Sequence, residues 1–177
     1  MTRTVFMNDL FCESAKIVKE VSAYDESMRS AEPYELTFEI PGKPQGKARP
    51  RVVRNRYTGK AHGITPEQTQ SYEDLIRWSW KVAGGRFLGD AQLAVHVVAY
   101  FEIPKSYSKK RVREIEEKGL CPTCKPDYDN ILKVISDALN RIAYRDDAQV
   151  VKASCEKKYA QNGAERVVVT IRTTEGR

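Results

Sequence analysis

The chain has 177 residues and carries 30 Lys and Arg against 24 Asp and Glu, so its formal net charge at pH 7 is +6. This length suits one domain with its own hydrophobic core, and the basic balance favours nucleic acid over a membrane as the partner. No apolar run approaches the roughly 18 residues that cross a bilayer, and the first residues lack a signal-peptide core. A cytoplasmic protein is therefore expected.

The front of the chain divides near residue 33. Residues 1–33 are predicted to form a helical N-terminal appendage, and residues 34–177 are predicted to form the main domain, since no low-complexity linker or repeat suggests another. From Glu35 to Ile40 apolar and polar side chains alternate, which predicts a strand that ends at Pro41.

A basic loop is predicted between Ile40 and Pro66, where the sequence contains no acidic residue. Gly and Pro interrupt it, and cations without neighbouring carboxylates are typical of a segment that contacts phosphates. A solvated charged loop without a partner remains the alternative. The candidate DNA-binding residues are Lys43, Lys47, Arg49, Arg51, Arg54, Arg56 and Lys60.

A helix is predicted next, with Thr65 as its cap and Pro66 at its first position, running toward Gly84. The apolar residues at helical spacing are Tyr72, Leu75, Ile76 and Trp80. A strand is predicted from Leu93 to Ile103. His96 is interpreted as an ordinary strand residue on the face opposite to the apolar side of this strand. Further predicted elements are a mixed-charge helix over 105–120, opened by Ser106 or Ser108, and strands over 148–154 and 165–172.

Cys121 and Cys124 have the spacing of half a zinc site. The sequence offers no second Cys/His pair to complete it. Reduced thiols in a loop are therefore the preferred interpretation.

Five aspartates lie between Lys125 and Val151 of this otherwise basic chain, namely Asp127, Asp129, Asp137, Asp146 and Asp147. If the fold gathers them, each close pair repels by about 4 kcal/mol at an effective dielectric near 20, so a cation must hold them. A divalent metal ion is the predicted one. The hypothesis depends on the carboxylates of residues 127–129 and 146–147 meeting in one pocket beside an amine.

A helix is predicted between the two aspartate pairs. Counting about 100° per residue from Asp129, its apolar residues cluster between about 180° and 300° and form one buried face. Lys133 and Asp137 fall at about 40° and 80°, on the same open side as Asp129. An ordinary ion pair along the helix explains this alignment equally well. The predicted buried residues are Ile131, Leu132, Ile135, Ala138, Leu139 and Ile142.

Other metal and nucleophile chemistry fits the sequence poorly. A calcium loop counted from Asp127 would need Gly at its sixth position and Glu at its twelfth, where Leu132 and Ala138 stand. The chain also lacks a Gly-x-Ser-x-Gly elbow and a phosphate loop ending in Gly-Lys-Ser/Thr, and its two histidines are too few for a convincing triad.

Residues 125–133 (Lys-Pro-Asp-Tyr-Asp-Asn-Ile-Leu-Lys), 137–140 (Asp-Ala-Leu-Asn) and 144–150 (Tyr-Arg-Asp-Asp-Ala-Gln-Val) resemble the signature of the RusA family of Holliday junction resolvases, which is common in prophages. The likeness includes residues 40–44, 47–51, 65–66 and 101–106, and covers roughly residues 35–172. Residues 1–33 and the cysteine pair lie outside it.

The resemblance implies an α+β fold with a mixed β-sheet flanked by helices. It also implies a Mg²⁺-dependent endodeoxyribonuclease, with Mn²⁺ as a substitute, that acts as a homodimer on branched DNA with four-way junctions during recombination and repair. By motif position, the resemblance assigns the essential metal-binding role to Asp127, Asp129 and Asp147, and the essential amine to Lys133. It makes Asp146 a helper at the metal, and Asn130 and Asp137 supports of the site.

Two alternatives remain open at this point. A restriction-type metal nuclease would use the looser pattern of Asp127, Glu156 and Lys158. A non-catalytic DNA-binding module would use the carboxylates only to cap helices and to pair with Lys and Arg.

Overall fold

The structure is a computed structural model that describes residues 33–49, 51–54, 56, 61–161 and 164–174. The helix predicted within residues 1–32 lies outside the described residues. Within the described part of the chain, no helix is both long and apolar enough to span a membrane.

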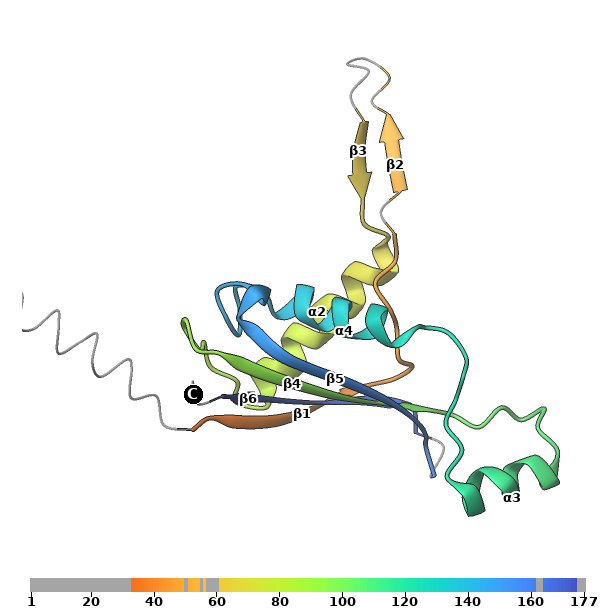
Figure 1. The fold of residues 1–177 in the computed structure, drawn as a ribbon. Helices are drawn as coiled ribbons and strands as arrows, with labels where there is room; N and C mark the ends of the chain where they lie inside the picture. The colour runs from red at the N-terminus through yellow and green to blue at the C-terminus, as the bar shows by residue number, and fades with distance from the viewer. Residues whose placement is uncertain (1–32, 50, 55, 57–60, 162–163, 175–177) are drawn as a thin grey trace, which may run out of the picture. The chain divides into compact units, whose positions relative to one another are not determined.

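The main sheet has four strands in the order β1 (Glu35–Pro41), β6 (Arg166–Thr173), β4 (Leu93–Phe101) and β5 (Val150–Tyr159). β1 and β4 pair with β6 in antiparallel register, whereas β4 pairs with β5 in parallel, so the sheet is mixed. Helices α2 (Glu67–Val82) and α4 (Tyr128–Leu139) lie on one face of this sheet (Figure 1). The predicted α+β fold is confirmed.

The core lies between the sheet and these two helices. Alternate residues of the strands point toward the helices, as the period of two in a strand requires, and the apolar side of each helix packs against them. Full burial of one such side chain contributes about 1.5–3 kcal/mol. The largest fully buried side chains include Trp80 of α2, Ile131 and Ile135 of α4, Leu93 of β4 and Ile171 of β6.

Parallel pairing of β4 and β5 positions the candidate site. Parallel strands need a crossover connection, and here it contains α3 (Lys109–Lys118), α4 and the short 3-10 helix η1 (Asp147–Gln149). The crossover returns the chain from the end of α4 to the start of β5. Both predicted aspartate pairs therefore lie on this single connection, one at the start of α4 and one before β5.

The predicted basic loop contains a two-stranded ribbon that the prediction did not include. β2 (Arg51–Arg54) and β3 (Ala61–Ile64) pair with each other in antiparallel register and, among the described residues, with no other strand. The adjacent valines Val52 and Val53 favour an extended backbone. The many Arg and Lys residues around these valines favoured the interpretation of the segment as a loop.

Several element boundaries also differ from the predictions. α2 begins at Glu67, because Pro66 has an extended ψ of 140° and occupies the cap position that was predicted for Thr65. β4 ends at Phe101, two residues before the predicted end. β5 continues to Tyr159, beyond the predicted residue 154, since its pairing with β4 extends over the full length of that strand.

Candidate active site

The first aspartate pair lies at the start of α4. Asp127 occupies the N-cap position with an extended backbone (φ −70°, ψ 151°), but its side chain makes no capping hydrogen bond. Asp129 lies in the first turn, and both side chains are exposed. Carboxylates are favoured here because the amino end of a helix carries partial positive charge. Neither carboxylate has a hydrogen bond or ion pair with another described residue, so both can accept a ligand.

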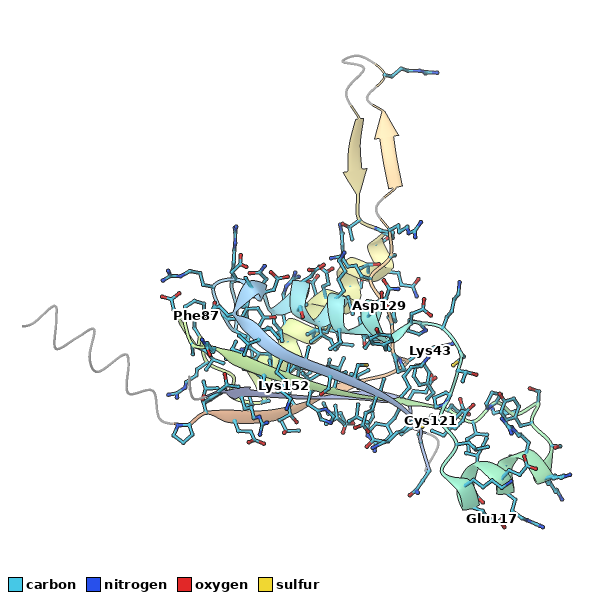
Figure 2. The ribbon with its side chains drawn as sticks, in the orientation of Figure 1. Lys43, Phe87, Glu117, Cys121, Asp129 and Lys152 are labelled. Carbon is cyan, nitrogen blue, oxygen red and sulfur yellow. The ribbon has the colours of Figure 1, made fainter. Side chains whose placement is uncertain are left out.

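Lys133 follows one helical turn after Asp129 and is exposed. Within the described residues its ammonium group has no ion pair. The start of α4 therefore presents two exposed carboxylates and one exposed amine, and Figure 2 labels Asp129 among them.

The segment after β1 crosses the start of α4 at close range. The Lys47 amide donates a hydrogen bond of 2.9 Å to the carbonyl of Asn130. A Cβ atom added to Gly46 would lie 2.9 Å from the Cβ atoms of both Asn130 and Pro126. Only glycine lets the two backbones approach this closely. Asn130, predicted as a support of the site, thus also fixes the crossing segment.

The Lys47 side chain joins that segment to both helices. Its Nζ lies 2.6 Å from Glu73 Oε1 on α2 and 2.8 Å from Asp137 Oδ2 on α4. Burial lowers the pKa of Lys47, but hydrogen bonds and charge attraction from Asp137 and Glu73 raise it above its ordinary value in sum. Arg77 adds a 3.3 Å contact to Glu73, so this largely buried carboxylate has two cationic partners.

The candidate DNA-binding cations therefore fall into different environments. Lys43, Arg49 and Arg56 are exposed, and Figure 2 labels Lys43 on the segment that follows β1. Lys47 is held in ion pairs and does not present a free ammonium group to phosphate. Only the backbone is described for Arg51 and Arg54, which belong to β2, and Lys60 lies outside the described residues.

The second aspartate pair forms a fixed turn before β5. Asp146 is the N-cap of η1, and its Oδ1 accepts a 2.9 Å hydrogen bond from the Ala148 amide. Gln149 Oε1 accepts from the amides of Arg145 and Asp146 at 2.8 and 3.0 Å. Asp147 is exposed and is not used in the cap. Its carboxylate is therefore free for a ligand, whereas Asp146 already uses one oxygen.

Tyr144 ties this turn to α4. Its side chain is fully buried, and its hydroxyl donates a 3.0 Å hydrogen bond to the Ser136 carbonyl. Burial raises the pKa of Tyr144, and the negative charges of Asp147 and Asp137 raise it further. The charges of both carboxylates thus act on one phenol.

No three Asp, Glu, His or Cys side chains in the described ranges come close enough together to hold a metal ion. The meeting of the two aspartate pairs around one cation therefore stays a prediction. The donor set still suits Mg²⁺, which prefers oxygen ligands and is usually held by one or two carboxylates together with waters and substrate phosphates. The unpartnered carboxylates of Asp127 and Asp129 fit such a shared ion better than a closed protein cage.

Lys157 of β5 holds the loop that leads to Asp127. Its Nζ donates to the carbonyl of Cys124 and, at 3.1 Å, to that of Pro126. The same Nζ lies 5.3 Å from the centroid of the Phe101 ring, a favourable cation–π distance. Lys157 therefore fixes the approach to α4 from the helix-covered face of the sheet.

The restriction-type alternative does not fit this geometry. Residues on either side of Lys157 point to the opposite face of the sheet, because side chains alternate along a strand. Glu156 and Lys158 form a 2.7 Å ion pair with each other and are both exposed. They are thus separated from Asp127 by the sheet, and that alternative is not retained.

Sequence reasoning missed three residues that shape the site. Glu73 is a buried charged residue on the same side of α2 as Ile76 and Trp80. Its helical spacing from these two apolar residues could have predicted that it is buried. Lys157 lies beyond the predicted end of its strand. Gln149 belongs to the motif of residues 144–150, but nothing in the sequence predicted which groups its side chain contacts.

Exposed oxygen ligands beside an amine, on a basic α+β domain, are typical of hydrolases that act on phosphodiesters. The model of the family described as endodeoxyribonuclease RusA matches residues 41–172, and the chain belongs to this family. It is also 35% identical over 140 residues to "Uncharacterized protein YqaN" of Bacillus subtilis (strain 168), a match that covers 77% of this chain and 95% of that protein. The family resemblance noted in the motifs is confirmed.

Proposed function

We propose that this protein is a Mg²⁺-dependent endodeoxyribonuclease that resolves four-way DNA junctions by hydrolysing phosphodiester bonds. One observation supports this most directly: Asp127, Asp129 and Lys133 lie exposed at the start of α4, and no described residue forms an ion pair with them. Charged groups left free on a helix start are available to a metal ion and a phosphate.

Each motif residue receives a role that its environment permits. Asp127, Asp129 and Asp147 hold the metal ion, with Asp146 assisting through its remaining oxygen, and Mn²⁺ can replace Mg²⁺. A bound Mg²⁺ supplies Lewis-acid stabilisation of the phosphate charge and a water of lowered pKa. The Lys133 ammonium neutralises negative charge that develops on the phosphate oxygens.

The overall reaction is a balanced hydrolysis. The water oxygen bonds to phosphorus while the bond from phosphorus to one ester oxygen breaks. One proton of the water ends on the leaving oxygen, and the other is released to solvent. One DNA end then carries a phosphate monoester and the other a hydroxyl group.

Cations of the segment after β1 hold the DNA backbone. These are Lys43, Arg49, Arg51, Arg54, Arg56 and Lys60, while Lys47 keeps the segment against α2 and α4. Contacts of this kind fix the position of DNA without reading its sequence. A homodimer would present two sites about a two-fold axis, which suits the symmetry of a four-way junction. Light scattering at micromolar concentration measures this oligomeric state.

The deciding experiment compares cleavage of a synthetic four-way junction, a linear duplex and a single strand with Mg²⁺ and with EDTA. We expect metal-dependent, paired nicks in the junction alone, and a loss of at least about 100-fold in Asp127→Asn, because a ligand of the reacting centre is removed. Glu67→Gln is the matched control, since Glu67 is an exposed carboxylate in the first turn of α2 without an ion pair to another described residue.

Metal binding is tested separately by thermal unfolding. Millimolar Mg²⁺ or Mn²⁺ should raise the melting temperature of the wild type, because a ligand that binds only the folded state stabilises it. The increase should shrink in Asp127→Asn. Junction binding without cleavage under any divalent ion would instead favour a non-catalytic DNA-binding module.

A further inference from the structure

Helix α3 begins with positively charged residues, whereas negative charge at the amino end is what stabilises a helix. Ser108 caps it by accepting a 3.3 Å hydrogen bond from the Arg111 amide, so Lys109 and Lys110 occupy the first turn, which has no acidic residue. Carboxylates come only later, from Glu114 onward. Cations are unfavourable at the amino end of a helix, where the peptide dipoles already place positive charge. Helix stability therefore does not account for these lysines.

The cations before and within this helix lack internal partners. Lys105, Lys109, Lys110 and Arg113 are exposed, and within the described ranges none of them forms an ion pair with a carboxylate. Arg111 differs, because it lies 3.3 Å from Glu114. No carboxylate occurs between Lys105 and Arg113 in the sequence. The positive charge at this end of α3 is thus available to an external anion.

Three of these cations share the outward side of α3. Ile115 is the buried residue of the helix, and Val112 beside it is half-buried. Counting about 100° per residue from Lys109, Arg113 lies at about 40° and Lys110 at about 100°, whereas Ile115 lies at about 240°. Helix α3 lies to one side of the sheet in Figure 2, where Glu117 is labelled on this helix.

The connection from α3 to the candidate active site is structurally defined. Gly119 ends the helix in the left-handed conformation (φ 61°). The chain then passes Cys124 and Pro126, whose carbonyls are both held by Lys157, and reaches Asp127. A DNA strand that contacts α3 would therefore be positioned by the same loop that carries the candidate metal ligand.

We propose that Lys105, Lys109, Lys110 and Arg113 form a second surface for the DNA backbone, the α3 surface. Phosphate is its ligand, because unpaired ammonium and guanidinium groups at the amino end of a helix attract anions from both their own charge and the peptide dipoles. This inference rests on the proposed function, and it extends the DNA contact beyond the segment that follows β1.

The test uses the full chain with a triple variant, Lys109→Gln, Lys110→Gln and Arg113→Gln. The matched control replaces three exposed cations outside α3, Lys81→Gln, Lys152→Gln and Arg172→Gln. Binding of a synthetic four-way junction and of a linear duplex is measured in EDTA over a series of salt concentrations. The α3 variant should bind about tenfold or more weakly at 0.1 M salt, and its slope of log affinity against log salt should fall by about 2 to 3, since each lost phosphate contact contributes about 0.9.

The control variant should keep the wild-type slope and bind within about threefold of the wild type. The α3 variant should unfold at the wild-type temperature or above it, since the substitutions relieve charge at the amino end of the helix. Equal salt slopes for the α3 variant and the wild type, or equal losses in both variants, would overturn the proposal.

The outcomes separate this inference from the proposed nuclease. A chain that binds through the α3 surface but never cuts with Mg²⁺ would refute the nuclease and leave the surface intact. Normal cleavage together with unchanged DNA binding by the α3 variant would refute the surface alone.

Discussion

The side-chain amide of Gln149 forms four hydrogen bonds beside the candidate active site. Its oxygen accepts from two amides of the turn that carries Asp146 and Asp147. Its nitrogen donates at 2.9 Å to the carbonyls of Gly89 and Ala91 in the neighbouring loop. Gln149 is thus a positioning residue, because it attaches the second aspartate pair to the start of β4.

Gln149→Glu should lower cleavage by about 10- to 100-fold and raise the Mg²⁺ concentration needed for half-maximal activity, as losses of groups that orient metal ligands do. The substitution keeps the size and the accepting oxygen, but it sets a carboxylate oxygen against the carbonyls of Gly89 and Ala91. Cleavage rates over a Mg²⁺ titration measure this effect.

Gln92→Glu is the control for that prediction, since Gln92 is an exposed neighbour of the same loop. It should leave the Mg²⁺ requirement unchanged. A normal Mg²⁺ titration for Gln149→Glu would show that the turn does not depend on this amide.

At the scale of elements, the site depends on the crossing of the 43–49 segment over the start of α4. Gly46 permits the approach, and Lys47 fixes it through Asn130, Glu73 and Asp137. The basic segment and the carboxylate-bearing helix are therefore one structural unit. A change in the crossing should affect the DNA contacts and the metal ligands together.

Gly46→Ala should lower the free energy of unfolding by about 1–3 kcal/mol, because its methyl group would meet two side chains at Cβ, close to their backbones, and must push the segments apart. It should also reduce cleavage more than DNA binding, because one of the two contacts is with Pro126, which directly precedes Asp127 and Asp129 in the chain. Urea unfolding, junction cleavage and junction binding measure the three effects.

Gly84→Asn is a suitable comparison. Gly84 has a φ of 82°, and no atom lies within 4 Å of a Cβ added there. The substitution therefore removes the conformational freedom of a glycine without creating a steric contact. If Gly46→Ala were as stable and active as the wild type, the close crossing would not matter to the site.

At the scale of the whole molecule, the interior holds titratable groups in their neutral forms. Burial raises the pKa of Tyr72 from 10.0 to about 12 and that of the Cys155 thiol from 9.0 to about 11. Burial likewise raises the pKa of Tyr144. Each group keeps its proton to a higher pH in the folded protein than in the unfolded chain.

The free energy of unfolding should therefore fall as pH rises through this range. Below pH 9 both states are protonated at these groups and their contribution is complete; above it the unfolded chain releases protons that the folded protein retains. The loss begins with Cys155 and continues through the window of Tyr72, from pH 10.0 to about 12. Urea unfolding at pH 8, 9, 10 and 11 measures it.

Tyr144→Phe isolates one contribution to this pH dependence. It should cost about 1 kcal/mol at pH 7 for the lost hydrogen bond to Ser136, but it should make the decline above pH 10 shallower than in the wild type. The exposed Tyr128 supplies the control Tyr128→Phe, which should reproduce the wild-type curve. Parallel curves for Tyr144→Phe and the wild type would contradict the assigned role of burial.

Local pattern was sufficient for much of this molecule. The buried face of α4 was largely predictable, because a single amphipathic helix has only one apolar stripe to bury. The prediction omitted the buried Val134, and two residues that it included, Leu132 and Ile142, are only partly buried. The inward side of β4 followed from alternation, and the aspartate motifs indicated the family. These features depend on residues within a few positions of each other.

The tertiary structure alone decided which charged residues are free. Lys43 and Lys47 are similar in sequence context, yet only Lys47 meets Glu73 and Asp137, which lie 26 and 90 positions further along the chain. The sequence by itself determined the helices, the inward strand faces and the chemistry available near α4. Parallel pairing of β4 with β5 and the close crossing at Gly46 decided which of those groups meet, because contacts between distant segments depend on packing that no local pattern encodes.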